Sequence, residues 1–181
     1  MNGPMGDLRI VNPTEEELRC LMPDLVHLYE RAYAALPEYG YHLSQRIEGY
    51  IRWLFRGDPK GFFVALLGER VAGFIGVHAQ WWEDGELFGE IHEFVVDPDF
   101  QGKGIGTALF THALTYLETS GRRKIGLWVG EKNEHAIAFY LRRGFRRVGQ
   151  YGKWVRMVKE VSVPVPSRDS GETPPSSGSK R

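Results

Sequence analysis

A glycine-rich run at residues 101–106 is the part of the sequence whose residue types point most directly to chemistry. It reads Gln-Gly-Lys-Gly-Ile-Gly and follows an apolar segment that ends at Asp97-Pro98. Glycines at alternate positions permit unusual backbone dihedrals, so successive N–H groups can point into one concavity. A helix that starts directly afterwards adds the positive end of its dipole. The run therefore predicts a turn that binds phosphate.

Nucleotide-binding loops of two common kinds fit this run less well. The Gly-x-x-x-x-Gly-Lys-Ser/Thr pattern of a nucleotide triphosphate loop is absent from the run. The preceding strand is predicted to lie in an antiparallel meander, whereas a dinucleotide-binding turn follows the first strand of a βαβ unit. A glycine-rich run can also do no more than reverse the chain. The phosphate-binding interpretation therefore depends on the elements around the run.

The elements that position this turn follow from hydrophobic periodicity and turn residues. Pro23 interrupts the first predicted helix, and because proline lacks an N–H we expect a break there. The strands between residues 62 and 97 form an antiparallel meander, and a βαβ order follows. This order predicts a mixed α/β (α+β) fold. We expect strands at 8–11, 62–67, 71–80, 87–97 and 124–129, helices at 14–34, 44–55, 104–120 and 134–143, and a final hairpin over 145–161.

Composition predicts one domain and a cytoplasmic setting. The chain has 181 residues, 42% of them hydrophobic, which is enough for one core and too few for two ordinary ones. We assign residues 1–161 to the domain and expect the Pro/Ser/Gly-rich residues 162–181 to be a disordered tail. Cys20 is the single cysteine, and no Cys/His cluster has the spacing of a zinc site, so we expect no metal. No stretch is apolar for long enough to span a membrane.

Charge is balanced overall and divided along the chain. The formal net charge is zero, which argues against a protein built to bind nucleic acid. Residues 1–98 contain 8 basic and 16 acidic side chains, whereas residues 99–160 contain 12 and 5. Such asymmetry suits an anionic cofactor on one half and a cationic substrate on the other, although solvated faces can also segregate in this way.

Two motifs at separate places resemble the GNAT superfamily of acetyl-CoA-dependent N-acetyltransferases. The superfamily's cofactor motif, Gln/Arg-x-x-Gly-x-Gly/Ala, is matched at each defined position by Gln101, Gly104 and Gly106. The later segment 133–145 matches a second signature of the superfamily. In this signature an asparagine, here Asn133, is followed by an alanine, then by Phe-Tyr and finally by Gly-Phe. The resemblance covers roughly residues 8–161. It implies a central, mostly antiparallel and splayed mixed β-sheet flanked by helices.

The resemblance also implies which residues bind acetyl-CoA. The strand before the turn would pair its backbone with the pantetheine arm, and backbone amides of the turn would hold the pyrophosphate. Asn133 would lie near the cofactor arm and can also cap the helix that begins there. The basic cluster at residues 142–147 is not assigned to the site. The implied cofactor-binding residues are Phe94, Val95, Val96, Gln101, Gly102, Lys103, Gly104, Ile105, Gly106, Thr107, Asn133 and Tyr140.

The catalytic roles implied by the resemblance fall on Tyr140 and on one of two carboxylates. Tyr140 matches a tyrosine proposed to protonate the departing thiolate, and it can instead be a buried aromatic residue. Glu90, eleven residues before Gln101, matches the base of histone-acetylating relatives. Glu93 has the opposite strand parity and would project from the other face unless a bulge intervenes.

Further groups on the same strand have alternative roles. His92 would share the face of Glu90 and could instead relay a proton. The N–H of Val95 is the expected donor to the thioester oxygen. A cross-strand salt bridge would explain either carboxylate equally well.

The acceptor is expected to be a small-molecule or peptide amine, and its identity stays open. Trp128 stands where similar ribosomal-protein acetyltransferases carry Glu, which disfavours that acceptor. The acyl chain length of the donor is also open, and the alternative function is a non-catalytic acyl-CoA-binding or sensing module. Aromatic and acidic residues suit a cationic amine, although the same aromatics could belong to the core or to a homodimer surface. The candidates for the acceptor pocket are Tyr33, Tyr39, Tyr41, His42, Trp53 and the turn at 81–84.

Overall fold

The computed structural model describes residues 7–162, so the predicted tail lies outside the described residues apart from Ser162. The strands are β1 (Leu8–Val11), β2 (Phe62–Leu67), β3 (Arg70–Glu83), β4 (Glu86–Val96), β5 (Lys124–Gly130), β6 (Arg146–Tyr151) and β7 (Trp154–Glu160). The helices are α1 (Glu15–Tyr33), α2 (Ser44–Gly57), α3 (Ile105–Thr119) and α4 (Glu134–Leu141), with 3-10 turns η1 (Pro37–Tyr39), η2 (Pro59–Gly61) and η3 (Pro98–Phe100).

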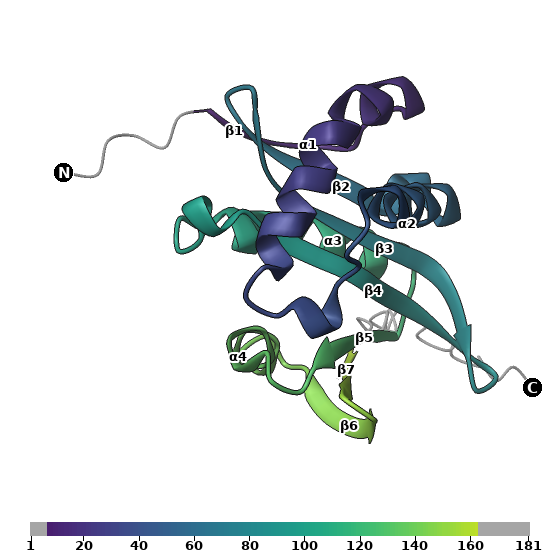
Figure 1. The fold of residues 1–181 in the computed structure, drawn as a ribbon. Coiled ribbons are helices and arrows are strands. Elements are labelled where there is room, and N and C mark those ends of the chain that lie inside the picture. The colour runs from purple at the N-terminus through teal and green to yellow at the C-terminus, as the bar shows by residue number, and fades with distance from the viewer. Residues whose placement is uncertain (1–6, 163–181) are drawn as a thin grey trace, which may run out of the picture.

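The strands form a single mixed sheet in the order β1-β2-β3-β4-β5-β7-β6 (Figure 1). The pair β4–β5 is parallel, and every other neighbouring pair is antiparallel. The meander from β2 to β4 and the βαβ unit β4–α3–β5 both follow the predicted order. The predicted α+β class with a mostly antiparallel sheet is confirmed.

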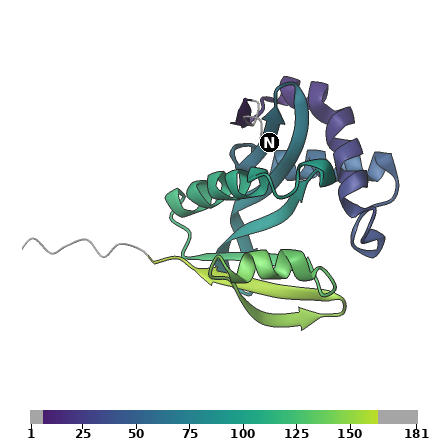
Figure 2. The ribbon, with the colours of Figure 1, turned by 90° about the vertical axis from the view of Figure 1, so that its left-hand side faces the viewer.

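Helices cover both faces of this sheet. One apolar cluster joins α1 and α2 to the sheet through residues such as Leu25, Ile51 and Phe74. A second cluster joins α3 and α4 to the opposite face through residues such as Leu109 and Ile137. Figure 2 shows α1 and α3 on opposite sides of the strands. Because the sheet separates two cores, a ligand that enters between its strands touches elements from both.

Helix α1 continues through Pro23, so the predicted break is wrong. Pro23 is exposed, and the carbonyl of Arg19 that loses its hydrogen bond also lies on the exposed face, where water can hydrate it. The buried residues of α1 lie on both sides of the proline: Leu18 and Met22 before it, and Leu25, Leu28 and Tyr29 after it. Packing on both sides of Pro23 therefore holds one helix together.

The sheet opens between its two central strands. β4 pairs with β5 only from Gly89↔Ile125 to Ile91↔Leu127, although β4 continues to Val96. Over the same length β5 stays paired with β7 as far as Gly130. The splay that the resemblance implied is therefore present, and it leaves one edge of the last residues of β4 without a neighbouring strand.

Residues 7–162 lack two features that are typical of other classes of protein. No helix in this span combines the length and apolar character needed to cross a membrane. Within the same residues, no group of three or more His, Cys, Asp and Glu side chains is arranged to hold a metal ion. Cys20 is exposed on α1.

Candidate active site

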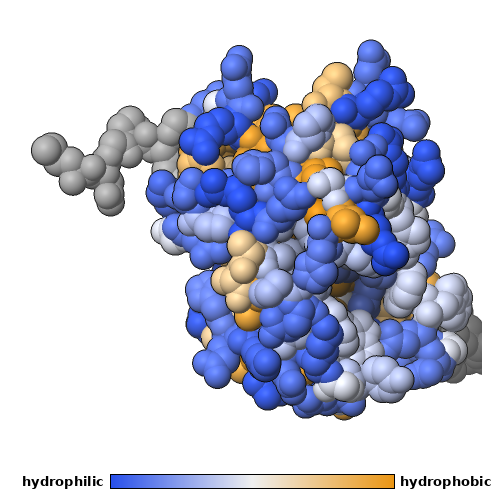
Figure 3. Space-filling view, viewed as in Figure 1, coloured by the Kyte–Doolittle hydropathy of each residue, from blue (hydrophilic) through white to orange (hydrophobic). Residues whose placement is uncertain are grey.

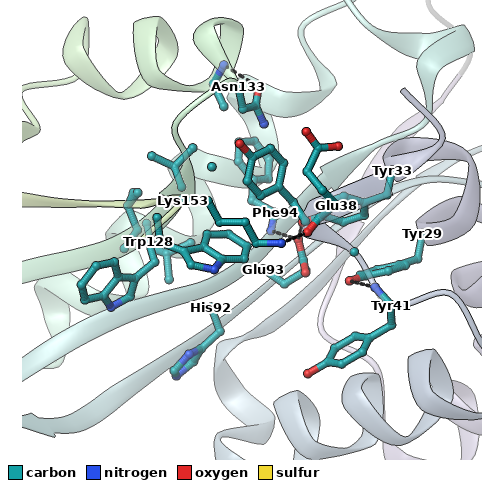
Figure 4. Close-up of a pocket in the computed structure, with 18 of the residues that line it drawn as sticks. Tyr29, Tyr33, Glu38, Tyr41, His92, Glu93, Phe94, Trp128, Asn133 and Lys153 are labelled. Atoms are coloured by element: carbon teal, nitrogen blue, oxygen red, sulfur yellow. Dashed lines mark hydrogen bonds between the residues drawn. The ribbon is translucent and has the colours of Figure 1, made fainter. Parts of the chain in front are cut away.

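A cavity of about 450 Å³ lies where β4 and β5 separate. Figure 3 shows the surface hollowed on this face, within surroundings that are mostly hydrophilic. Figure 4 shows side chains from α1, from the α1–α2 connection and from β4, β5 and the β6–β7 hairpin around the cavity. The lining residues include Tyr29, Tyr33, Glu38, Tyr39, Tyr41, Tyr50, His92, Glu93, Phe94, Trp128, Asn133, Tyr140, Lys153 and Trp154.

The N-terminus of α3 is built to receive an anion. Gly102 and Gly104 have φ of 73° and 79°, a left-handed conformation that glycine adopts without strain. Gly104 is the N-cap and supplies no side-chain cap, and no acidic residue lies in the first turn. The first N–H bonded within the helix is that of Ala108, to Gly104 O at 3.0 Å. The amides of residues 105–107 therefore have no acceptor within the helix.

A cation lies beside these amides. Arg143 Nη2 donates to Thr107 Oγ1 at 3.1 Å, and its guanidinium lies 3.4 Å from the centre of the Phe139 ring. Lys103, in contrast, turns toward the ring of Phe100, with Nζ 5.2 Å from the ring centre. The donors at this end of α3 are thus backbone amides supported by an arginine, which suits a phosphate group.

The register of β4 determines which of its amides face the opening. Asp97 N–H donates to Ala72 O at 2.9 Å, and the register runs without a shift back to Gly76↔Glu93. Hydrogen-bonded pairs alternate in an antiparallel ladder, so Val95 bonds to β3, whereas Phe94 and Val96 direct their N–H groups toward the opening. The expected donor at Val95 is therefore not supported by the register.

A β-bulge at His92 changes the face of the candidate carboxylates. Gly76 pairs with Glu93, Val77 with Ile91 and His78 with Glu90, so His92 is an extra residue in β4. Because of this insertion, Glu90 and Glu93 project from the same face, contrary to the regular alternation. Tyr50 O–H donates to the His92 carbonyl at 3.1 Å, and α2 thereby holds the bulge in place.

Glu93 is buried at the floor of the cavity. Its Oε1 accepts Tyr33 O–H at 2.8 Å and Phe94 N–H at 3.2 Å. Burial raises the pKa of Glu93 to about 7, although these hydrogen bonds lower it. A carboxyl group with this pKa can accept a proton near neutral pH. Figure 4 shows Glu93 beneath Phe94 and close to Tyr33.

Glu90 lies outside the cavity lining and is part of a buried ion cluster. Arg156 Nη1 donates to Glu90 Oε1 at 2.6 Å, and Arg156 Nη2 donates to Glu83 Oε2 at 2.9 Å. Burial raises the pKa of Glu90, and Arg156 opposes that shift. The cross-strand salt bridge that the sequence suggested for Glu90 is therefore present. It joins β4 to β7, which are separated in the sheet by β5.

Tyr140 and Asn133 bring α4 to the cavity. Tyr140 is buried, and burial followed by the charge of Glu93 raises its pKa, so its phenol stays protonated. Asn133 Oδ1 accepts the N–H of Ala136 at 3.2 Å, which caps α4 while the residue also lines the cavity. The cap and the position at the cavity, both expected for Asn133, occur together.

The structure changes the set of acceptor-pocket residues. Tyr33, Tyr39 and Tyr41 line the cavity as predicted, whereas, in the described part of the chain, His42, Trp53 and residues 81–84 do not. Sequence reasoning missed Tyr29 and Tyr50, which looked like ordinary helix-face positions. It also missed Trp154 and Lys153, which come from a hairpin with no motif. Burial lowers the pKa of His92 to about 3, so His92 is neutral.

Comparison with known proteins defines the family. The model of the Acetyltransferase (GNAT) family matches residues 22–145. The chain is 40% identical over 154 residues to MJ1207 of Methanocaldococcus jannaschii, named an uncharacterized N-acetyltransferase, covering 84% of this chain and 66% of that protein. The chain belongs to the acetyltransferase (GNAT) family.

Two further comparisons describe the breadth of this likeness. PH1933 from Pyrococcus horikoshii OT3 has a crystal structure that matches with a TM-score of 0.79 and 38% identity, over 87% of this chain and 100% of that one. A mycothiol acetyltransferase of Geodermatophilus obscurus is 37% identical over 130 residues, which cover 70% of this chain and 41% of that protein. The chain thus spans less than half of this last relative.

Proposed function

We propose that this chain transfers an acetyl group from acetyl-CoA to a primary amine by direct attack in a ternary complex. The observation that carries the proposal is the uncapped N-terminus of α3, which lies next to the unpaired end of β4. Residues 101–107 are not part of the cavity lining, but a Cβ at Gly106 would lie 3.5 Å from the side chains of Phe94 and Val96. The open amides suit the pyrophosphate, and the free edge of β4 suits an extended arm that pairs with Val96. Membership of the acetyltransferase family supports the same co-substrate.

The residues around the cavity have complementary roles in the proposed transfer. Glu93 takes a proton from the ammonium, so that the amine nitrogen can form a bond to the thioester carbonyl carbon. The N–H of Phe94, which donates to Glu93 Oε1 in the structure, transfers this hydrogen bond to the thioester and stabilises the charge that develops on the carbonyl oxygen. As the C–S bond breaks, Tyr140 protonates the departing sulfur. Asn133 and the amides of residues 101–107 position the donor.

Glu93 is preferred to Glu90 as the base because of where each carboxylate lies. Glu93 lines the cavity, whereas Glu90 is held by Arg156 outside it. Removing one partner of a buried ion pair is strongly destabilising, so we assign Glu90 a structural role.

Calorimetry with acetyl-CoA, followed by a thiol-release assay with a panel of amines, tests the proposal. We expect binding, and turnover with at least one amine. Tyr140→Phe should lower kcat about 100-fold with little change in acetyl-CoA affinity, and Tyr151→Phe, at an 80% exposed position, is the matched control. Full activity of Tyr140→Phe would show that Tyr140 is not the general acid. Binding without turnover would favour the alternative, a non-catalytic acyl-CoA-binding module.

A further inference from the structure

Four tyrosine rings enclose the acceptor side of the cavity. Tyr29 and Tyr33 come from α1, Tyr41 from the α1–α2 connection and Tyr50 from α2. Their rings are close together, with centroids 4.6 Å apart for Tyr29–Tyr33 and 5.2 Å apart for Tyr41–Tyr50. Glu93 lies where this wall reaches β4 and accepts the O–H of Tyr33. Aromatic faces leading to a buried carboxylate are well suited to a cation with an apolar stem.

The charges that line the cavity do not match an acidic acceptor. Among the described lining residues, Lys153 is the sole Lys or Arg, and its Nζ donates to the backbone carbonyl of Glu38. The carboxylate of Glu38 is in turn paired with Lys132 at 3.5 Å. His92 is neutral because burial lowers its pKa. One of the three N–H donors of Lys153 is thus engaged, so a carboxylate on the acceptor would meet a single, partly engaged cation together with the acidic Glu93.

The α1–α2 connection is held against β5 and the β6–β7 hairpin at the side of this pocket. The phenol oxygen of Tyr39 accepts the N–H of Lys132 at 3.2 Å, and the Tyr39 ring meets that of Trp154 at 5.2 Å. The ring lies against Gly130, where a Cβ would come within 2.5 Å of it. Figure 1 shows the connection reaching from α1 toward α4 and β5, in front of β4. Because these contacts hold the α1–α2 connection in place beside the cavity, we expect a slender acceptor to fit better than a branched or cyclic one.

We propose that the acceptor is a primary ammonium at the end of an unbranched aliphatic chain with no acidic group near the amine. This inference rests on the proposed acetyl transfer. The tyrosine faces hold the ammonium and its methylene stem, and Glu93 removes one proton from nitrogen. The N–C bond then forms as the C–S bond breaks, and Tyr140 gives its proton to the departing thiolate. The nitrogen loses its second proton to the Tyr140 phenolate, which leaves the amide and the free thiol. A free diamine and a lysine side chain share this chemistry.

Matched acceptors test the inference on the full chain. In the thiol-release assay, 1,4-diaminobutane should give a kcat/KM at least about tenfold above that of 4-aminobutyrate, in which a carboxylate replaces one aminomethyl group. Glucosamine and a short peptide with only an α-amine should be weaker still. Nα-acetyl-lysine amide separates the two sources, since turnover with it at the level of the diamine would indicate a lysine side chain.

The outcomes separate this inference from the proposed function. Preference for 4-aminobutyrate, glucosamine or a peptide α-amine would overturn the alkylammonium assignment and leave acetyl transfer intact. Turnover with none of these amines, in spite of acetyl-CoA binding, would overturn the assignment as well. Failure to bind acetyl-CoA would overturn the proposed function itself.

Variants at Tyr41 test the aromatic wall with little risk to folding, because this side chain is 44% exposed. Tyr41→Leu removes the π face and should raise the KM for 1,4-diaminobutane about two- to fivefold. Tyr41→Phe keeps the π face and should raise KM less than Tyr41→Leu does. Equal KM values for the two variants would show that the ring does not contact the ammonium. Thermal melting of both variants confirms that they are folded.

Discussion

Helices α1 and α3 begin in opposite ways. At the start of α1, Glu17 N–H donates to Thr14 Oγ1 at 3.2 Å and Thr14 N–H donates to Glu17 Oε2 at 2.7 Å. Three acidic residues lie in that first turn. At the start of α3 there is neither a side-chain cap nor an acidic residue. The first helix end is complete within the chain, whereas the second is left to a ligand.

From this difference we infer that the start of α1 contributes to stability and the start of α3 to the proposed binding of the cofactor. A capping box satisfies orphan N–H groups and places negative charge near the positive end of the helix dipole. The glycines before α3 forgo this stabilisation, and the amides they leave open are the groups that a phosphate requires. The sequences of the two helix starts therefore favour α3 over α1 as the proposed binding site.

The largest expected effect comes from Gly104→Val. Gly104 has φ of 79°, and a β-branched residue is strained there although its Cβ would meet open space. We expect the affinity for acetyl-CoA to fall about 100-fold by calorimetry, because the amides of the turn lose their arrangement. Gly68→Val is the control, since Gly68 also has a positive φ and open surroundings, on the β2–β3 turn. If both variants keep full affinity, α3 does not bind the cofactor.

The next effect concerns pH, because backbone amides do not titrate and Glu93 does. With the pKa of Glu93 raised to about 7, kcat should fall about tenfold for each pH unit below 7 and level off above it. Glu93→Gln should lower kcat and remove this limb while acetyl-CoA affinity is kept. If kcat of Glu93→Gln still falls below pH 7, the proton transfer belongs to another group.

The same shift has a consequence for stability. The ordinary pKa of Glu93 is 4.5 and the folded value lies above it, so the folded state binds this proton more tightly. Protonation of Glu93 therefore contributes to the free energy of unfolding. This contribution is fully present below pH 4.5 and is lost as pH rises through 7. Denaturant unfolding at pH 5 and pH 8 should therefore show a smaller pH difference for Glu93→Gln than for the parent chain.

Giving α3 a carboxylate at its start sharpens the comparison further. Thr107→Glu places negative charge in the first turn of α3, where Thr107 is exposed. We expect the helix to gain about 0.3–1 kcal/mol and acetyl-CoA affinity to fall about tenfold by repulsion. Thr111→Glu, one turn later on the exposed face, should change affinity less than about threefold. Equal losses for the two variants would indicate a general charge effect.

Removing the cap of α1 should have the smallest effect on binding. Thr14→Ala deletes the side-chain acceptor for Glu17 N–H and should lower the free energy of unfolding by about 0.5–2 kcal/mol. Acetyl-CoA affinity should not change, because this helix end lies apart from the cavity lining. A loss of affinity comparable to that of Thr107→Glu would contradict the division between the two helix starts.

Local patterns predicted the elements and the turn that leads into α3. β1 and β2 have the predicted bounds, and α3 starts one residue after the predicted position, because periodicity and turn residues act over short distances. Pro23 misled the prediction because the tertiary packing that carries α1 across it is not visible locally. The same limit applies to the bulge at His92, which depends on pairing between β3 and β4.

The acceptor side was the least predictable part of the site. Tyr29 and Tyr50 have the spacing of helix-face residues, and no local signal separates a cavity wall from a core position. Arg156, which pairs with Glu90, lies 66 residues away in the chain, so its role follows only from the order of the strands. The amide orientation of Val95 likewise depends on register, which sequence alone did not determine.

The contacts that Tyr39 makes with Lys132 and Trp154 also have a consequence for the order of folding. The turn before α3 and the strand before that turn occupy one continuous segment, from β4 into α3, so the backbone amides of the donor half come from residues close in the chain. Tyr39 and the amide of Lys132 are 93 residues apart, and closing so long a loop is slow. During refolding, the capacity to hold the donor should return before the pocket for the amine is complete.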